Sequence, residues 1–566
     1  MAHRGTPFAV LLVTVACFLG TVRLSVAQSK NLDTGKPSPS ISEPHPNSAA
    51  TYRIAGVVVS KVDGHTLSRA RVMVGNARGG QTPIWMITAE DGRFQFPGLP
   101  AGKYSLAGAK RGFVTSAYDQ HDQFSTAIVT GAGLDTENLV LKLSPDAVIS
   151  GKVLDEAGEA VRHATVTLYS EDHRDGVDQI RAFGNAQTDD QGNYEITPLA
   201  PGTYFLSADA RPWYAVHPQP AISSPGSRAT TAAVDRSLDV AYSKTYYPDV
   251  TEADSAMPIP VRGGEHVPVD IHLNPVPALS VIFHVPGGSK NGPVFPRLEQ
   301  PAFDSSSFVQ AFGGRMISSD VLEISGIPAG RYNIRTQAAG SGTQMNNIDL
   351  SKDGEVIDTS RGEALGSIKI SVQVQGESAI PKDLSVWLRA KGRVAAVTQN
   401  VDAKGEAELQ QIPPGKYEVE VVSRTALSIA RIAAEGAEVS GRTLILMAGA
   451  SASASLTLSL GSAEIEGTVE RAGKGFAGAM VVLVPKNPED NRDLFRRDQS
   501  DLDGSFTLHR VLPGSYTLLA IENGWDLDWS RPEVIAVYAK QGRPIEVTNH
   551  AAQPWRIPDA VAVQPK

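Results

Sequence analysis

The side chains capable of catalysis are dispersed along this 566-residue sequence and form no catalytic spacing. A zinc hydrolase needs His and Glu ligands close together, as in His-Glu-x-x-His, and the 12 histidines never show that pattern. The sequence contains neither a Gly-x-Ser-x-Gly nucleophile elbow nor a phosphate-binding Gly-x-x-x-x-Gly-Lys-Ser/Thr loop. His121-Asp122 and the pair of His163 and His173 come closest to a metal cluster, and we interpret them as surface loop residues. We therefore expect no enzyme activity, no cofactor and no metal.

Two turns that contain Asp resemble the first part of a calcium-binding loop. They are Asp189-Asp190-Gln-Gly192 and Asp501-Leu-Asp503-Gly504. Neither continues with the remaining spaced oxygen ligands or the closing Glu of an EF-hand. In a hairpin turn, Asp accepts hydrogen bonds from its own backbone and Gly supplies the left-handed torsion. We interpret both segments as hairpin turns.

Aromatic residues that stand close together are the candidates for ligand binding. Aromatic rings pack against the apolar faces of sugars, and loops at the end of a β-sandwich commonly carry binding residues. The alternative is that these rings cover local edges of the hydrophobic core. Our hypothesis assigns carbohydrate binding to Trp213, Tyr214, Tyr246, Tyr247, Trp525 and Trp529.

The elements that must position these residues come from a segment that occurs five times. Its pattern is an apolar residue, two residues that include Pro, and then Gly-x-Tyr. In four copies a further Gly stands twelve positions before the Tyr, and two turns with two strands of about six residues fill that spacing. The repeated pairs are Gly102 and Tyr104, Gly202 and Tyr204, Gly330 and Tyr332, Gly415 and Tyr417, and Gly514 and Tyr516.

Apolar and polar residues alternate around these turns, as they do in strands with one buried face. Ile465, Gly467 and Val469, for example, alternate with Glu and Thr. No long 3.6-residue apolar period with caps is present, so we expect little helix. Each repeated Tyr is interpreted as a corner residue with its ring in the core and its hydroxyl on the backbone. The predicted fold is all-β, a tandem array of about five antiparallel β-sandwich domains.

The spacing of the repeats predicts the domain boundaries, and several domains are expected because 566 residues exceed one core. The third copy is the most degenerate. The predicted division is a signal peptide at 1–27, a flexible leader at 28–50, β-sandwiches at 51–145, 146–276, 277–363, 364–461 and 462–550, and a C-terminal tail at 551–566.

The repeated unit resembles the carboxypeptidase regulatory-like domain, a transthyretin-like sandwich grouped with carbohydrate-binding-like folds. Members of that family are appended to peptidases, transporters and surface proteins. The resemblance implies an accessory or binding role here, because the catalytic domain that the module usually accompanies is absent. The second copy carries the pattern most fully, in Gly151, Val153, Asp155, Gly158, Ala164, Val166, Leu168, Thr188, Asp189, Gly192, Tyr194, Leu199, Pro201, Gly202, Tyr204, Leu206 and Ala208.

The N-terminal segment predicts export. His3 and Arg4 precede an apolar run, and Ser25-Val26-Ala27 supplies small residues for cleavage, so we expect a periplasmic or extracellular protein. Cys17 is the only cysteine, and lipoprotein anchoring through it is not expected because Thr14 replaces the usual branched aliphatic residue. No transmembrane segment is expected in the mature chain.

Charge and repeats together define the functional hypotheses. The net charge of −9 offers no cationic surface for nucleic acid. The leading hypothesis is an exported, non-catalytic multidomain binding or scaffold protein that binds polysaccharide. The alternative is a structural spacer or a protein-partner subunit of a cell-envelope assembly. A more remote alternative is a hydrolase whose catalytic cluster is assembled between domains.

Overall fold

The structure is a computed structural model, and its described part confirms the all-β prediction. The signal peptide, the leader and Cys17 lie outside the described residues. The described residues are 51–566 except for 78, 80–81, 174–175, 177, 218–234, 285–295, 310–312, 319–320, 339–341, 360–361, 376–378, 391–395, 426, 461–462, 490 and 549–553.

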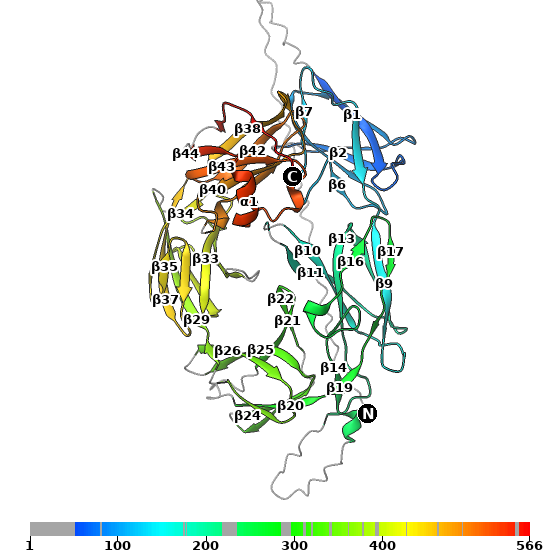
Figure 1. Ribbon diagram of the computed structural model, residues 1–566, viewed down its shortest axis with the longest axis vertical. Helices are drawn as coiled ribbons and strands as arrows, with labels where there is room; N and C mark the ends of the chain where they lie inside the picture. The colour runs from blue at the N-terminus through cyan, green and yellow to red at the C-terminus, as the bar shows by residue number, and fades with distance from the viewer. Residues whose placement is uncertain are drawn as a thin grey trace, which may run out of the picture. The chain divides into compact units, whose positions relative to one another are not determined.

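One sheet of each sandwich is built around its opening strand, which pairs antiparallel with the strand before the Gly-x-Tyr turn and parallel with a later strand (Figure 1). In sandwich 1 these strands are β4 (Arg93–Leu99), β1 (Tyr52–Ser60) and β8 (Leu139–Leu143). Sandwich 2 uses β12 (Asn193–Leu199), β9 (Ala147–Leu154), β17 (His266–Pro268) and β18 (Ile271–His272). Sandwich 3 uses β23 (Gly313–Ser318), β24 (Val321–Ile327), β20 (Leu279–His284) and β27 (Glu355–Asp358). Sandwich 4 uses β32 (Glu406–Ile412), β29 (Gly366–Val374), β37 (Ser451–Leu460) and β34 (Leu427–Glu435).

The opposite sheet pairs the second strand of the unit with the strand that begins at the Gly of Gly-x-Tyr. Sandwich 1 has β3 (Ile84–Ile87), β2 (Arg71–Asn76), β5 (Gly102–Ala109), β6 (Ser116–Ala117) and β7 (Ile128–Thr130). Sandwich 2 has β11 (Gln179–Gln187), β10 (Thr165–Asp172), β13 (Gly202–Asp209), β15 (Thr245–Tyr246) and β16 (Ile259–Val261). Sandwich 3 has β22 (Ser305–Phe308), β21 (Arg297–Ala302), β25 (Gly330–Ala338), β26 (Gly342–Leu350) and β28 (Glu363–Ala364). Sandwich 4 has β31 (Ala396–Asn400), β30 (Ser385–Ala390), β33 (Gly415–Val422), β36 (Thr443–Leu446) and β35 (Glu438–Ser440).

Sandwich 5 repeats this plan and takes its last strands from residues predicted to form a tail. Its opening strand β38 pairs parallel with β45 and β46, as β1 does with β8. Trp555 and Val561 pack on the core of sandwich 5, so this segment completes the sandwich rather than leaving it. The strands are β38 (Ala463–Arg471), β39 (Lys474–Gly475), β42 (Ser505–Val511), β45 (Trp555–Arg556) and β46 (Val561–Ala562), opposite β41 (Arg496–Gln499), β40 (Met480–Pro485), β43 (Gly514–Ile521) and β44 (Arg543–Val547).

Helix is a minor component of the described residues. The α-helix α1 spans Pro532–Ala539, with Pro532 in its first turn, where no backbone donor is needed. Short 3₁₀ turns occur at Arg236–Leu238, Ala253–Ser255, Arg492–Leu494 and Gly524–Asp526, and β14 (Val240–Tyr242) pairs with β19 (Pro275–Pro277). No described helix is long and apolar enough to cross a membrane.

The repeated Tyr holds the same place in each sandwich. Each ring is buried, and each hydroxyl donates to the backbone carbonyl four residues earlier. The bond ties the Gly-x-Tyr strand to its own turn, so the turn and the core are fixed together. The donor and acceptor pairs are Tyr104 and Pro100, Tyr204 and Ala200, Tyr332 and Pro328, Tyr417 and Pro413, and Tyr516 and Leu512.

Candidate functional site

One end of sandwich 2 carries an exposed aromatic surface. Trp213 and Tyr214 lie in the segment after β13, where Ala215 N–H donates to Pro212 O (3.2 Å) and closes a turn. The Trp213 side chain is 84% exposed, although exposed tryptophan is unusual in a folded domain. Its ring lies 5.8 Å from that of Tyr214 at an interplanar angle of 88°. The two rings therefore offer two apolar planes at a right angle.

Glu156 places a carboxylate beside this aromatic pair. It belongs to the turn after β9, which Asp155 fixes by accepting from the N–H groups of Ala157 (3.0 Å) and Glu159 (2.7 Å). The Tyr214 hydroxyl donates to one Glu156 oxygen, and the Tyr242 hydroxyl donates to the other at 3.2 Å.

Burial and this carboxylate set the ionisation of the two tyrosines. Partial burial, reinforced by Glu156, raises the pKa of Tyr214 to about 12. The same two causes raise the pKa of Tyr242. Both phenols therefore remain neutral donors at physiological pH. The candidate sugar site, defined as Trp213, Tyr214, Tyr242 and Glu156, combines an exposed ring with one anionic acceptor.

The structure does not bring Tyr246 and Tyr247 into this site. Tyr246 is 1% exposed and packs against Tyr169 and Phe303, with ring centroids 6.4 and 5.5 Å away. Tyr247 is partly buried against the core of sandwich 2. Neither ring presents a free face of the kind that Trp213 offers, and both fit the alternative of core covering.

Trp525 and Trp529 lie against two other sandwiches. Trp525 is 9% exposed and stacks on His121 of sandwich 1, with centroids 5.0 Å apart and planes 7° from parallel. Trp529 is 8% exposed, and its ring packs so closely on Gly176 of sandwich 2 that a Cβ atom at that position would clash with it. These two indoles are therefore part of contacts between sandwiches and leave no face for a sugar.

Arg497 on β41 is the centre of this aromatic contact, and the sequence did not single it out. Its guanidinium lies 4.8 Å from the ring centroid of Phe124 and 4.6 Å from that of Trp529. The side chain is only 4% exposed and forms an ion pair with Asp122 at 3.6 Å. Cation–π contacts gain strength when they are desolvated, so this arrangement stabilises the junction of sandwiches 1 and 5.

Polar bonds extend the same junction. Gln499 donates to Asp119 O (2.6 Å) and to Thr126 Oγ1 (2.8 Å), and Lys103 Nζ lies 2.6 Å from an Asp501 oxygen. Asp501 also accepts from the N–H of Ala127 at 3.0 Å. Asp189 instead accepts from the N–H groups of its own turn, as predicted for a hairpin turn. Asp501 holds the same turn position in sandwich 5 as Asp189 does in sandwich 2, but its carboxylate binds sandwich 1.

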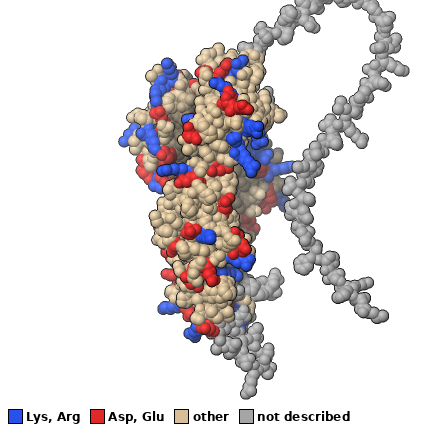
Figure 2. All heavy atoms as spheres, turned by 90° about the vertical axis from the view of Figure 1, so that its right-hand side faces the viewer, with Lys and Arg blue, Asp and Glu red and all other residues tan. Residues whose placement is uncertain are grey.

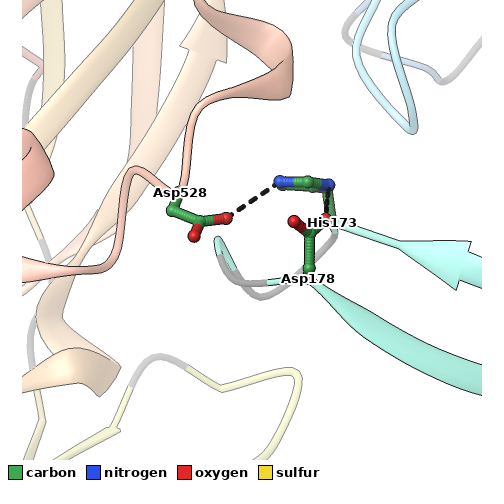
Figure 3. Close-up of side chains that lie close together, drawn as sticks. All are labelled: His173, Asp178 and Asp528. Atoms are coloured by element: carbon green, nitrogen blue, oxygen red, sulfur yellow. Dashed lines mark hydrogen bonds and ion pairs between the residues drawn. The ribbon is translucent and has the colours of Figure 1, made fainter. Parts of the chain in front are cut away.

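His173, Asp178 and Asp528 form the cluster of potential metal ligands among the described residues, with His173 and Asp178 in sandwich 2 and Asp528 in sandwich 5 (Figure 3). Nδ1 of His173 lies 2.6 Å from Asp178 and Nε2 lies 3.0 Å from Asp528. The carboxylates stand on opposite ring nitrogens, so neither nitrogen faces the centre of a closed coordination sphere. His173 therefore links sandwich 2 to Asp528 of sandwich 5 through a polar contact.

Comparisons with known proteins agree with the repeated sandwich fold. The carboxypeptidase regulatory-like domain matches residues 53–139 and 148–234. The second β-sandwich domain of BOS complex subunit NOMO1-like proteins matches residues 463–543. No curated protein shows a significant sequence match to this chain.

Solved structures show distant similarity. The Bacillus anthracis TIE protein is 12% identical, with 74% of this chain and 75% of that chain covered and a TM-score of 0.17. A streptococcal ancillary pilin is 12% identical, and the alignment covers 54% of this chain and 98% of the pilin with a TM-score of 0.20. The minor pilin GBS52 of Streptococcus agalactiae is 14% identical, and the alignment covers 40% of this chain and 97% of the pilin with a TM-score of 0.20.

The fold and its contacts define a multidomain protein made of tandem β-sandwiches. Within it, sandwiches 1 and 2 match the carboxypeptidase regulatory-like domain, and sandwich 5 matches the NOMO1-like second β-sandwich domain. The resemblance seen in the sequence is therefore confirmed.

Proposed function

We propose that this chain is an exported, non-catalytic multidomain protein that binds carbohydrate at the candidate sugar site. The observation that carries the proposal is the exposure of Trp213, 84%, beside Tyr214, whose hydroxyl donates to Glu156. An exposed indole packs on the apolar face of a pyranose ring, and a carboxylate accepts hydrogen bonds from its hydroxyls.

The charge of the site narrows the ligand class. Glu156 is exposed and Asp155 precedes it, so the described part of the site carries the negative charge of these carboxylates. Sugars that carry carboxylates or sulfates would meet like charge there. Neutral polysaccharides and polysaccharides of amino sugars fit the site best.

The test is retention of the purified protein on a panel of soluble and insoluble glycans. We expect retention on neutral or amino-sugar glycans, and weaker retention on uronic-acid glycans at low salt. If no glycan in the panel retains the wild-type protein, the carbohydrate proposal is wrong.

Contacts between sandwiches favour a second candidate function, that of a structural spacer or partner-binding subunit in a cell-envelope assembly. The bonds of Gln499, at the end of β41, and of Asp501, in the turn after it, to sandwich 1 support this candidate, because they join one module to another. Figure 2 shows acidic and basic side chains interspersed on the face in view, with uncharged surface between them. Purification from the native envelope separates the candidates, because a stable protein complex without glycan supports the spacer.

A further inference from the structure

The outer edge of sandwich 1 is apolar and exposed. β3 is the terminal strand of its sheet, beside β2. Ile84, Trp85 and Ile87 are 51%, 51% and 57% exposed. Natural edge strands are usually protected from pairing by charge, Pro or a bulge. β3 itself contains neither a charged residue nor Pro, although Pro83 directly precedes it and the guanidinium of Arg71 lies 4.8 Å from the centroid of the Trp85 ring.

The register of β3 shows which of its backbone groups are free to pair. Thr88, directly after β3, donates its N–H to Ala70 O at 2.8 Å, whereas the N–H of Ala70 donates to Thr88 Oγ1, so the Thr88 N–H is the group that faces β2 here. Residues whose backbone groups face the neighbouring strand alternate along an antiparallel ladder, which makes Met86 the next such residue of β3. Trp85 and Ile87 therefore direct their N–H and C=O groups away from β2.

The corresponding edge strands of two other sandwiches are each in contact with a neighbouring sandwich. On β41 of sandwich 5, Gln499 bonds Thr126 of sandwich 1 at 2.8 Å. On β11 of sandwich 2, the N–H of Ile180 donates to Asp304 of sandwich 3 at 2.7 Å. In two sandwiches of this chain, that edge of the fold therefore contacts another sandwich of the same type.

We propose that β3 is the interface through which two copies of this chain pair, as an antiparallel two-fold dimer centred on Met86. In that arrangement Trp85 of one copy lies opposite Ile87 of the other, and these are the residues with outward backbone groups. Two such pairs make four backbone hydrogen bonds. β3 contains no charge, so self-pairing places no like charges opposite each other. A two-fold contact of one patch with itself also closes and does not propagate into a fibre.

The first test measures mass in solution by size-exclusion chromatography with light scattering. Because β3 is short, dimerisation should depend on concentration, and we expect the measured mass to rise from one chain to two chains as the protein is concentrated. Trp85→Lys should shift the protein to the monomer mass, because Lys on an edge strand opposes pairing. Val62→Lys is the matched control, since Val62 is 64% exposed in the same sandwich but outside its strands. A wild type that stays monomeric, or a dimer that survives Trp85→Lys, overturns the proposal.

The second test checks the register of the dimer and leaves the exposed apolar residues of β3 unchanged. Across the two-fold axis, Met86 meets its own counterpart as a non-hydrogen-bonded pair with Cα atoms about 4.5 Å apart, which a disulfide can span. Met86→Cys should therefore form a disulfide-linked dimer under oxidising conditions. Wild type, with Cys17 alone, and Val62→Cys are the controls. Equal cross-linking of Val62→Cys, or none with Met86→Cys, contradicts a dimer centred on Met86.

Discussion

At the scale of single residues, exposure decides which aromatic side chains remain candidates for binding. Trp213 stands 84% exposed on a turn, whereas Trp525 and Trp529 are less than a tenth exposed. The sequence could single out all three as aromatic, but it could not separate them. The contact partners of Trp525 are His121 and Phe124, about 400 positions away in the sequence, and only the folded chain places them together.

Asp498 illustrates a second feature that the sequence could not reveal. It lies on β41 and accepts from the N–H of Thr507 at 2.6 Å. Loss of solvent raises the pKa of this carboxyl to about 7. An ordinary Asp in the unfolded chain titrates near pH 4.

The first prediction follows from this shift. Between about pH 4 and pH 7 the folded chain holds a proton on Asp498 that the unfolded chain has lost, so stability falls as pH rises through that window. Asp498→Asn, which stays neutral, should raise the thermal unfolding midpoint at pH 8 and leave it nearly unchanged at pH 4. At pH 8 the free energy of unfolding of Asp498→Asn should exceed that of wild type by an amount on the order of 1–3 kcal/mol.

Asp402→Asn is the control with the opposite sign. Hydrogen bonds from the backbone of Glu406 and Lys404 lower the pKa of Asp402, so its charge stabilises the fold above the ordinary Asp pKa. This variant should be less stable than wild type at pH 8. An Asp498→Asn variant that is equally destabilised at both pH values would contradict the assignment.

At the scale of elements, the Gly-x-Tyr turn was predictable because all its determinants are local. Pro, Gly and Tyr lie within six residues in each copy, and the Tyr hydroxyl bonds a carbonyl four residues earlier. The pairing of residues 555–562 was not predictable, because β45 and β46 are two-residue strands. Their position follows from the plan of the other four sandwiches, in which the opening strand has a parallel partner.

The second prediction concerns this corner. Tyr516→Phe removes the bond to Leu512 O (2.9 Å) and leaves a buried carbonyl without its donor. The expected loss is about 1–2 kcal/mol in the unfolding free energy of sandwich 5, measured by chemical denaturation. Tyr516→Leu also removes ring volume from the core and should cost more, about 3 kcal/mol. If the Phe variant is as stable as wild type, the hydroxyl bond does not hold the corner.

At the scale of the whole molecule, the described contacts join modules that are distant in sequence. Lys103 of sandwich 1 and Asp501 of sandwich 5 are 2.6 Å apart, with side chains 26% and 12% exposed. Burial raises the pKa of Asp501, while Lys103 opposes that shift. The modules could be predicted from the repeats in the sequence. The residues that join one sandwich to another differ from copy to copy and follow no repeated pattern, so they could not be predicted.

The third prediction is a coupling between these two residues. A double-mutant cycle of Lys103→Ala and Asp501→Ala should give a coupling free energy of about 1 kcal/mol, because each single change removes the same ion pair. Asp501→Ala alone should cost more than Lys103→Ala, since Ala127 also loses its acceptor. The control cycle pairs Asp501→Ala with Lys142→Ala, an exposed lysine of sandwich 1. Additive effects in the first cycle would contradict the contact between sandwiches 1 and 5.

The most direct test of carbohydrate binding is calorimetric titration of a retained glycan into wild type, Trp213→Ala and Phe183→Ala. Phe183 is a matched control because it is also an exposed aromatic residue, at 57%, and lies on β11 of the same sandwich. Loss of a stacked aromatic ring should weaken binding at least tenfold in Trp213→Ala, about 1.4 kcal/mol or more, and leave the affinity of Phe183→Ala unchanged. Equal affinity of wild type and Trp213→Ala would contradict the proposed sugar site.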